Sequence, residues 1–87
     1  MQADHANIEQ LLKTAKGQLD GILKMIDEDR YCIDISNQIM ATEAILNRAN
    51  KEVISAHLKK CLLNAKNEED QEQKIEELIN LIDKLAK

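Results

Sequence analysis

One stretch of the sequence limits the fold more than any other: no glycine or proline interrupts the chain between Cys32 and Asn64. Apolar side chains recur along this stretch at spacings of three and four residues, which is the pattern of an α-helix. The spacing predicts a helix over residues 33–64, about 45 Å long at about 1.5 Å per residue. The mean helix has only about 11–12 residues. Because apolar residues cover much of its girth, this helix needs a partner, and self-association is the simplest way to provide one.

Two shorter segments with helical periodicity flank this stretch. An apolar stripe predicts a first helix over about 7–27, followed by an exposed corner at Asp27–Asp29. A third amphipathic segment predicts a helix over about 70–86, with acidic residues at its start and lysines at its end, which suits the helix dipole. The predicted fold is therefore all-α, with a three-helix protomer whose second helix is long and whose third helix is short. The prediction treats residues 1–87 as a single domain.

The composition supports this fold class. Proline, phenylalanine and tryptophan are absent, tyrosine occurs once and glycine twice, whereas most β-sheet folds need aromatic strands and turns rich in glycine and proline. With 44% hydrophobic and 32% charged residues, the composition is that of a globular protein. No apolar run approaches the ~20 residues of a membrane span, and no signal peptide is evident at the N-terminus. We therefore expect a cytoplasmic protein, without a membrane partner, whose cysteines are reduced thiols.

Three of the four cysteine and histidine residues lie along the long second helix. His57 and Cys61 are four residues apart, so they share one helix face within reach of a single metal ion. Cys32 precedes His57 by twenty-five residues, which corresponds to about 37 Å along a continuous helix. Unless the chain folds back, Cys32 can join this pair only from a second chain. An antiparallel pair of these helices would then form two identical sites related by two-fold symmetry.

Two thiolates and one imidazole form a soft set of three donors. Soft thiolates favour Cu(I), Zn(II) or iron–sulfur chemistry. Structural zinc sites take four ligands, so a site with three donors suits Cu(I) best. The spacing alone leaves a different interpretation open, because a cysteine on a helix is often an inert small hydrophobe. The fourth residue of this kind, His5, is expected on the surface of a mobile N-terminal segment.

Seven short segments form a recognisable pattern: GQLDGI (17–22), MI (25–26), DRYCID (29–34), QI (38–39), NRAN (47–50), HLKKC (57–61) and IEELI (75–79). Over about residues 7–82 they resemble the CsoR/RcnR repressors, and the Cys…His-x-x-x-Cys spacing is characteristic of the copper-sensing CsoR branch. The resemblance implies a disc-shaped homotetramer made of two antiparallel dimers with four-helix-bundle cores. It also implies a repressor that binds operator DNA in the apo form. Copper binding would release it and derepress copper efflux genes.

The resemblance further implies roles for individual residues. Cys32, His57 and Cys61 would hold one Cu(I) per protomer, with the ligands shared between two chains. Tyr31 and Glu77 match positions that couple the histidine ligand to the DNA-binding state.

Charge alone does not favour DNA binding, because the net charge is −4 and dedicated nucleic-acid binders are usually basic. Arg48 nevertheless matches a DNA-contact position of the family. Family members often carry several arginines in the first helix, where this chain has Leu11, Lys13 and Lys16. With Arg48, the two lysines would form a modest basic patch that a tetramer presents four times, and phosphate contacts add across protomers. Each of the three is otherwise interpreted as a solvated surface charge.

Other functions remain as alternatives. A persulfide or thiol sensor of the same fold shares both cysteines but generally lacks the histidine. A nickel or cobalt sensor would need harder nitrogen ligands than the thiolate of Cys61. A helical protein-binding adaptor with inert cysteines belongs to a different class. An enzyme is not expected, because the sequence offers no plausible nucleophile–base pair in a pocket.

Overall fold

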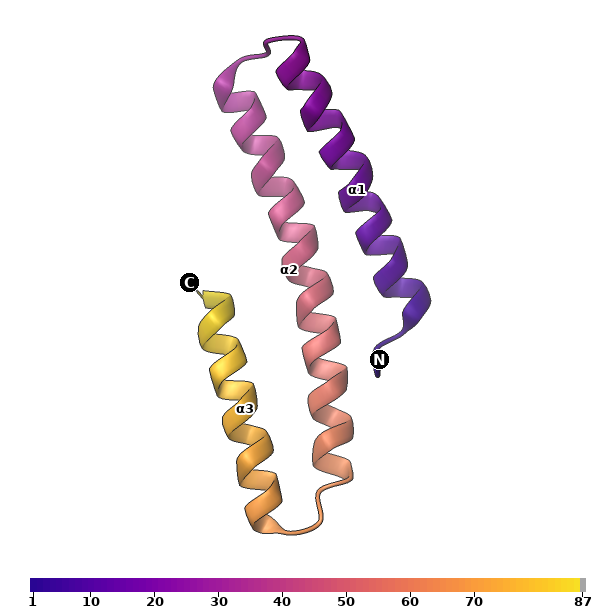
Figure 1. The fold of residues 1–87 in the computed structure, drawn as a ribbon, viewed down its shortest axis with the longest axis vertical. Helices are drawn as coiled ribbons and strands as arrows, with labels where there is room; N and C mark the ends of the chain where they lie inside the picture. The colour runs from indigo at the N-terminus through magenta and orange to yellow at the C-terminus, as the bar shows by residue number, and fades with distance from the viewer. Residues whose placement is uncertain (87) are drawn as a thin grey trace. The chain divides into compact units, whose positions relative to one another are not determined.

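The computed structural model describes residues 1–86, and within this range the regular secondary structure is entirely α-helical. Helix α1 spans His5–Asp27, α2 spans Cys32–Leu63 and α3 spans Glu68–Ala86 (Figure 1). The all-α, three-helix prediction is confirmed, and α2 is the longest of these helices at 32 residues. None of the helices in the described range is both long enough and apolar enough to span a membrane.

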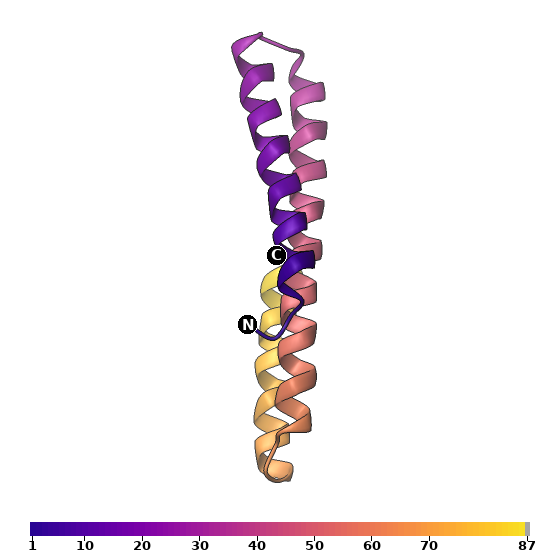
Figure 2. The ribbon, with the colours of Figure 1, turned by 90° about the vertical axis from the view of Figure 1, so that its right-hand side faces the viewer.

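The protein divides into two compact units, each built around part of α2. In the unit Asp4–Asn50, α1 runs beside the first part of α2. In the other unit, which contains Met1–Ala3 and the chain from Lys51 onward, α3 runs beside the last part of α2. Two perpendicular views show both pairings (Figures 1 and 2). The single domain over 1–87 stays a prediction.

Capping side chains explain where α1 and α3 begin. The Asp4 carboxylate accepts a 3.0 Å hydrogen bond from the Ala6 amide, which satisfies one of the unpaired N–H groups of the first turn. The Asn67 side chain accepts a 2.8 Å bond from the Asp70 amide, and the Asp70 carboxylate accepts a 3.1 Å bond from the Lys66 amide. Because these caps lie just before the first helical residues, both helices start two residues earlier than the apolar periodicity predicts.

The seam between α1 and α2 is narrow. Ile8, Ala15 and Ile22 are buried on α1 at intervals of seven residues, and Thr42 and Ala49 are buried on α2 at the same interval. A seven-residue repeat keeps one side of each helix turned toward its neighbour, as in a coiled coil. The small side chains of Ala15 and Ala49 let the two helices approach closely.

The polar residue in this seam, Thr42, is only 3% exposed. Its hydroxyl lies 3.1 Å from the Gln38 carbonyl oxygen on α2 and 2.9 Å from the side-chain oxygen of Gln18 on α1. A hydroxyl has one proton, so it donates to one of these oxygens at a time. Either bond satisfies the buried group, and the bond to Gln18 links the two helices.

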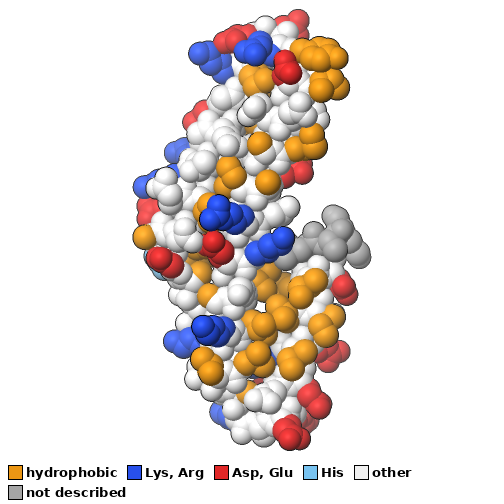
Figure 3. All heavy atoms as spheres, turned by 180° about the vertical axis from the view of Figure 1, so that it is seen from behind, with side chains coloured by type: hydrophobic (Ala, Val, Ile, Leu, Met, Phe, Trp, Pro, Cys, Tyr) orange, Lys and Arg blue, Asp and Glu red, His pale blue; other side chains and the backbone are white. Residues whose placement is uncertain are grey.

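Most of the large apolar side chains are not covered within one chain. Among the described residues, four apolar side chains are buried: Ile8, Ala15, Ile22 and Ala49. On α1, Leu23 is 61% exposed, and on α3, Ile79 is 52% exposed. Hydrophobic side chains gather over the α2–α3 pair in the space-filling view (Figure 3). A core this small gives limited stability to a chain of this length, so the exposed apolar faces suit burial by another chain.

The corner after α1 has the hydrogen bonds of a Schellman motif. The Asp29 amide donates to the Ile26 carbonyl oxygen and the Arg30 amide to the Met25 carbonyl oxygen, each at 3.0 Å. Asp29 has a φ of 53°, which is the left-handed conformation that this motif requires at its first residue beyond the cap and that glycine adopts most easily. The corner expected at Asp27–Asp29 therefore begins after Asp27, which still belongs to α1.

We predict that Asp29→Gly stabilises the protein by about 0.5–1 kcal/mol per protomer, because glycine removes the steric cost of positive φ. The matched control is Asp27→Gly, which places glycine inside the helix and should destabilise it by up to about 1 kcal/mol. Chemical denaturation of both variants measures the two changes. A loss of stability in Asp29→Gly would contradict this account of the corner.

Candidate metal centre

The candidate ligands His57 and Cys61 lie in the last turns of α2, in direct contact with each other. Their spacing of four residues places one side chain above the other on the helix surface. The His57 Nε2 atom lies 3.4 Å from the Cys61 Sγ atom. His57 is exposed and Cys61 is half-buried, and both cysteines are free thiols. The pair is therefore open to solvent on one side.

The separation of these two atoms fits shared coordination of one metal ion. With the bond lengths of zinc as a yardstick, about 2.3 Å to sulfur and about 2.0–2.1 Å to nitrogen, two ligands at about 110–120° stand about 3.5–3.8 Å apart. The observed 3.4 Å needs only a small side-chain rotation to reach this range. The Nδ1 atom of His57 would then remain available for a hydrogen bond, which ligating histidines usually make.

Two hollows border this pair, both within the unit that contains α3. The first, about 320 Å³, lies between α2 and α3 and is lined by Ile54, His57, Leu58, Cys61, Lys74, Glu77, Leu78, Asn80, Leu81 and Lys84. The second, about 470 Å³, is lined by Gln2, His57, Lys60, Cys61, Asn64, Lys66, Asp70 and Lys74. His57 and Cys61 line both hollows, so residues of α3 border the pair on its covered side, and Gln2 shares the second hollow with it.

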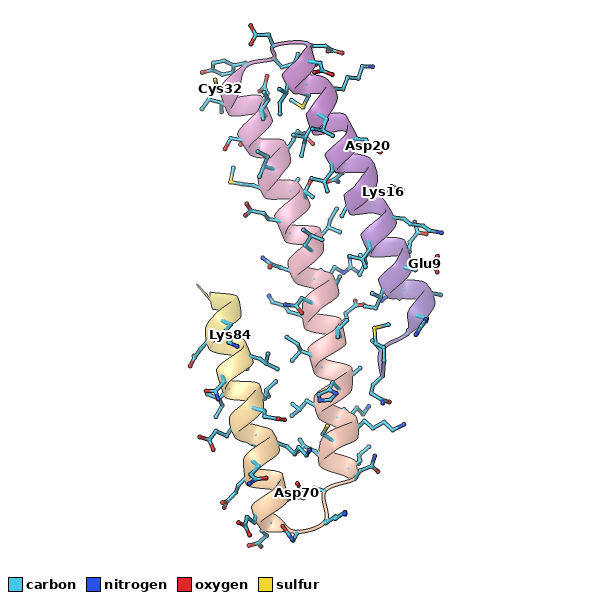
Figure 4. All side chains as sticks on the ribbon, viewed as in Figure 1. Glu9, Lys16, Asp20, Cys32, Asp70 and Lys84 are labelled. Carbon is cyan, nitrogen blue, oxygen red and sulfur yellow. The ribbon has the colours of Figure 1, made fainter. Side chains whose placement is uncertain are left out.

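Cys32 does not join His57 and Cys61 within one chain. It is the first residue of α2 (Figure 4), is exposed and belongs to the other compact unit. In the described part of the chain, no three histidine, cysteine, aspartate or glutamate side chains lie close enough together to hold a metal ion. One chain thus supplies two neighbouring donors and, separately, a third.

The residues predicted to act beside the ligands lie in different units. Glu77 lines the first hollow together with His57 and Cys61, whereas Tyr31 lies directly before Cys32 and is 67% exposed. A further residue, Lys74, which no sequence pattern indicated, lines both hollows. Its spacing of three residues to Glu77 places the two on one face of α3, but the sequence pattern does not place that face beside the pair. His5 is exposed at the start of α1.

The three candidate DNA-binding residues belong to the unit Asp4–Asn50, whereas the His57–Cys61 pair belongs to the other unit. Lys13, Lys16 and Arg48 are exposed. The Lys13 ammonium lies 3.0 Å from the Glu9 carboxylate, and Lys16 lies on the outer side of α1 (Figure 4). Leu11 is half-buried, so it contributes to packing and does not extend the basic surface. A role of these residues in DNA binding stays a prediction.

Known proteins match this chain over most of its length. The profile of a protein family described as "Metal-sensitive transcriptional repressor" matches residues 4–84. The copper-sensing transcriptional repressor CsoR of Mycobacterium tuberculosis (strain ATCC 25618 / H37Rv) is 41% identical over 71 residues, which cover 82% of this chain and 60% of that protein. The CsoR of Bacillus subtilis (strain 168) is 37% identical over 76 residues, which cover 87% and 75%. The chain thus spans about three fifths of the length of the mycobacterial relatives that it matches.

Two solved structures share the fold. The crystal structure of the copper-sensing repressor CsoR with Cu(I) from Geobacillus thermodenitrificans NG80-2 has a TM-score of 0.79 and 38% identity, and the match covers 94% of this chain and 85% of that one. The nickel-responsive transcriptional regulator InrS has the same TM-score, 0.79, at 25% identity, and the match covers 98% and 96%. Because the two TM-scores are equal, the fold does not distinguish the metals. The donor atoms must do so.

Proposed function

We propose, from the premise that this chain belongs to the family of metal-sensitive transcriptional repressors, that it is a Cu(I)-responsive repressor. In the apo form it binds operator DNA, and copper binding releases it and derepresses copper efflux genes. The observation that carries this proposal is the 3.4 Å contact between His57 Nε2 and Cys61 Sγ. In a family that responds to metals, a thiol and an imidazole in contact on one helix face are suited to be two ligands of one ion. The protein would act in the cytoplasm, where thiols remain reduced.

The donor set favours copper over the other metals. Cys32, His57 and Cys61 together offer two thiolates and one imidazole, and soft thiolate ligands select Cu(I). Bound Cu(I) would supply a soft cation that holds these three side chains in one arrangement. A relative with 38% identity was solved with Cu(I), which supports the same assignment here. Nickel sites use more nitrogen donors, and Cys61 suits them poorly.

The proposed site is shared between two chains, with one ion per protomer. His57 and Cys61 come from one chain and Cys32 from the partner subunit, because the three do not come together in the described part of one chain. Tyr31 precedes Cys32 directly, so whichever chain brings that cysteine also brings the tyrosine. The uncovered apolar faces of all three helices support an antiparallel dimer and its further assembly to a homotetramer. Each association would bury apolar surface that one protomer leaves in water.

The proposed DNA surface consists of Lys13, Lys16 and Arg48. Positive side chains on the outside of the unit Asp4–Asn50 can contact phosphates without disturbing the metal ligands, which belong to α2 at its two ends. Four copies in a tetramer would offset the unfavourable net charge, since affinity for DNA depends on the number of phosphate contacts.

The proposal predicts that the metal-free protein retards DNA from its own upstream region in a mobility assay, and that one Cu(I) per protomer abolishes the shift. X-ray absorption on the same anaerobic complex should show two sulfurs and one nitrogen around copper. A nitrogen-rich shell would favour a nickel-type sensor instead, whereas the absence of any defined shell would favour a helical adaptor with inert cysteines. Release by persulfide but not by copper would favour the thiol sensor.

Arg48→Glu is the control for this assay. It reverses a charge in the proposed phosphate-contact surface, so DNA binding should be lost while Cu(I) affinity stays nearly unchanged. If this variant still binds the operator with the same dependence on salt, the DNA surface lies elsewhere.

The shared site predicts that two defective proteins complement each other. When Cys32→Ala and Cys61→Ala dimers exchange subunits, one site of each mixed dimer receives Cys32 from one chain and the intact His57–Cys61 pair from the other. Tight Cu(I) binding should return to about one site per mixed dimer, measured by competition with a chromophoric chelator. Ligands drawn from a single chain would give no recovery, because each chain carries one defect.

The matched control mixes Cys61→Ala with His57→Ala. Both changes affect the same half of the site, so both sites of the mixed dimer remain defective and no binding should return. Equal recovery in the two mixtures would contradict the shared arrangement.

Coupling between metal and DNA depends, in this proposal, on Glu77. When His57 binds through Nε2, its Nδ1–H can donate a hydrogen bond, and Glu77 of α3 lines the same hollow. Such a bond would hold α3 against α2 in the copper-bound state, which is the kind of differential contact that an allosteric switch requires.

We predict that Glu77→Ala loses about tenfold or somewhat more of its Cu(I) affinity, because both thiolates remain, yet stays on operator DNA at copper concentrations that fill the site. Glu76→Ala is the matched control, because Glu76 is exposed on α3 and lines neither hollow. Operator affinity of both variants, with and without copper, measures the coupling. A full copper-induced drop in the Glu77→Ala protein would remove Glu77 from the switch.

A further inference from the structure

Lys74 combines three properties that the proposed function does not use. It lines both hollows beside the His57–Cys61 pair, and its side chain is half-buried. Among the described residues, no recorded ion pair includes it. The carboxylate of Asp70, four residues earlier on α3 and also in the second hollow, accepts a hydrogen bond from the Lys66 amide. An anionic group bound in the adjacent hollows would therefore attract this ammonium.

The charge of the metal complex depends on the ion. Metal binding displaces the protons of the two thiols, so an uncharged set of donors becomes two thiolates and a neutral imidazole with a charge of −2. The complex then has a net charge of −1 with a monovalent ion and none with a divalent ion. A nearby positive charge is attracted to the first complex, but to first order it has no net interaction with the second. The effect of Lys74 must therefore differ between the two classes of ion.

We propose that Lys74 is a specificity-determining residue of the metal site, whose ammonium favours a monovalent over a divalent ion by neutralising the bound dithiolate. This inference rests on the proposed ligand set of Cys32, His57 and Cys61. It concerns the choice of metal and does not depend on how the protein contacts DNA.

Other lysines border the hollows but are placed less favourably. Lys84 lines only the first hollow, and Lys60 and Lys66 line only the second. All three are exposed, whereas Lys74 is half-buried. Water and salt screen exposed charges more strongly. Glu77 in the first hollow and Asp70 in the second have the opposite charge, and their presence reduces the effect without changing the difference between ions.

The test compares Cu(I) and Zn(II) affinities of the unchanged chain, Lys74→Met and Lys74→Arg under reducing, anaerobic conditions. Each affinity comes from competition with a chelator specific for that ion. Lys74→Met should lower Cu(I) affinity on the order of three- to tenfold and leave Zn(II) affinity within about twofold. Lys74→Arg keeps the charge and should restore the selectivity. The loss in Lys74→Met should also shrink as salt is raised.

Lys59→Met is the matched control, because Lys59 is exposed on α2 beside the ligands and lines neither hollow. An equal loss of both affinities in Lys74→Met would overturn the inference, since packing damage acts on both ions alike. No loss for Cu(I), or the same loss in Lys59→Met, would overturn it as well. The failure of the proposed function has a different signature, namely that the unchanged chain itself binds no Cu(I) tightly.

Discussion

The continuity of α2 is the constraint on which the rest of this protein depends. This helix of 32 residues contributes its first part to one compact unit and its last part to the other. Cys32 occupies the first position, whereas His57 and Cys61 lie near the end. Among the described residues of one chain, these three donors do not come together. A site made from all three requires an assembly, so in the proposed function metal binding depends directly on quaternary structure.

The small core of the protomer makes that dependence stronger. The buried seam between α1 and α2 contains Ala15 and Ala49 among its few residues, and large side chains such as Leu23 and Ile79 remain in water. Association that covers them would contribute much of the stability of the folded state, which links folding to oligomerisation. A metal site between two chains would then lie at the interface whose buried apolar surfaces stabilise the fold. In that arrangement, a change at the ligands would alter the contacts between the chains of the assembly.

The sequence predicted the kind and number of helices because apolar periodicity extends over many residues and tolerates local exceptions. It placed the starts of α1 and α3 two residues too late, since each start depends on one capping group, Asp4 or Asn67, outside the apolar pattern. The contact of His57 with Cys61 was predictable because it lies within one helix. Lys74 was not found, because its position beside this pair depends on how α3 is aligned along α2. That alignment is set by contacts between residues distant in sequence, which periodicity does not contain.

An imidazole as the third donor would allow the proposed site to couple metal binding to a change elsewhere in the protein. A third thiolate would also be a soft ligand, but it would add a negative charge and would have no proton to donate once bound. In the proposed site, the imidazole of His57 would coordinate through one nitrogen and keep an N–H on the other, and Glu77 of α3 lines the same hollow as His57. In this proposal the two thiolates would provide most of the affinity for a soft ion, and the histidine would link metal binding to a contact between α2 and α3. Because separate atoms would carry binding and coupling, a substitution could weaken one without removing the other.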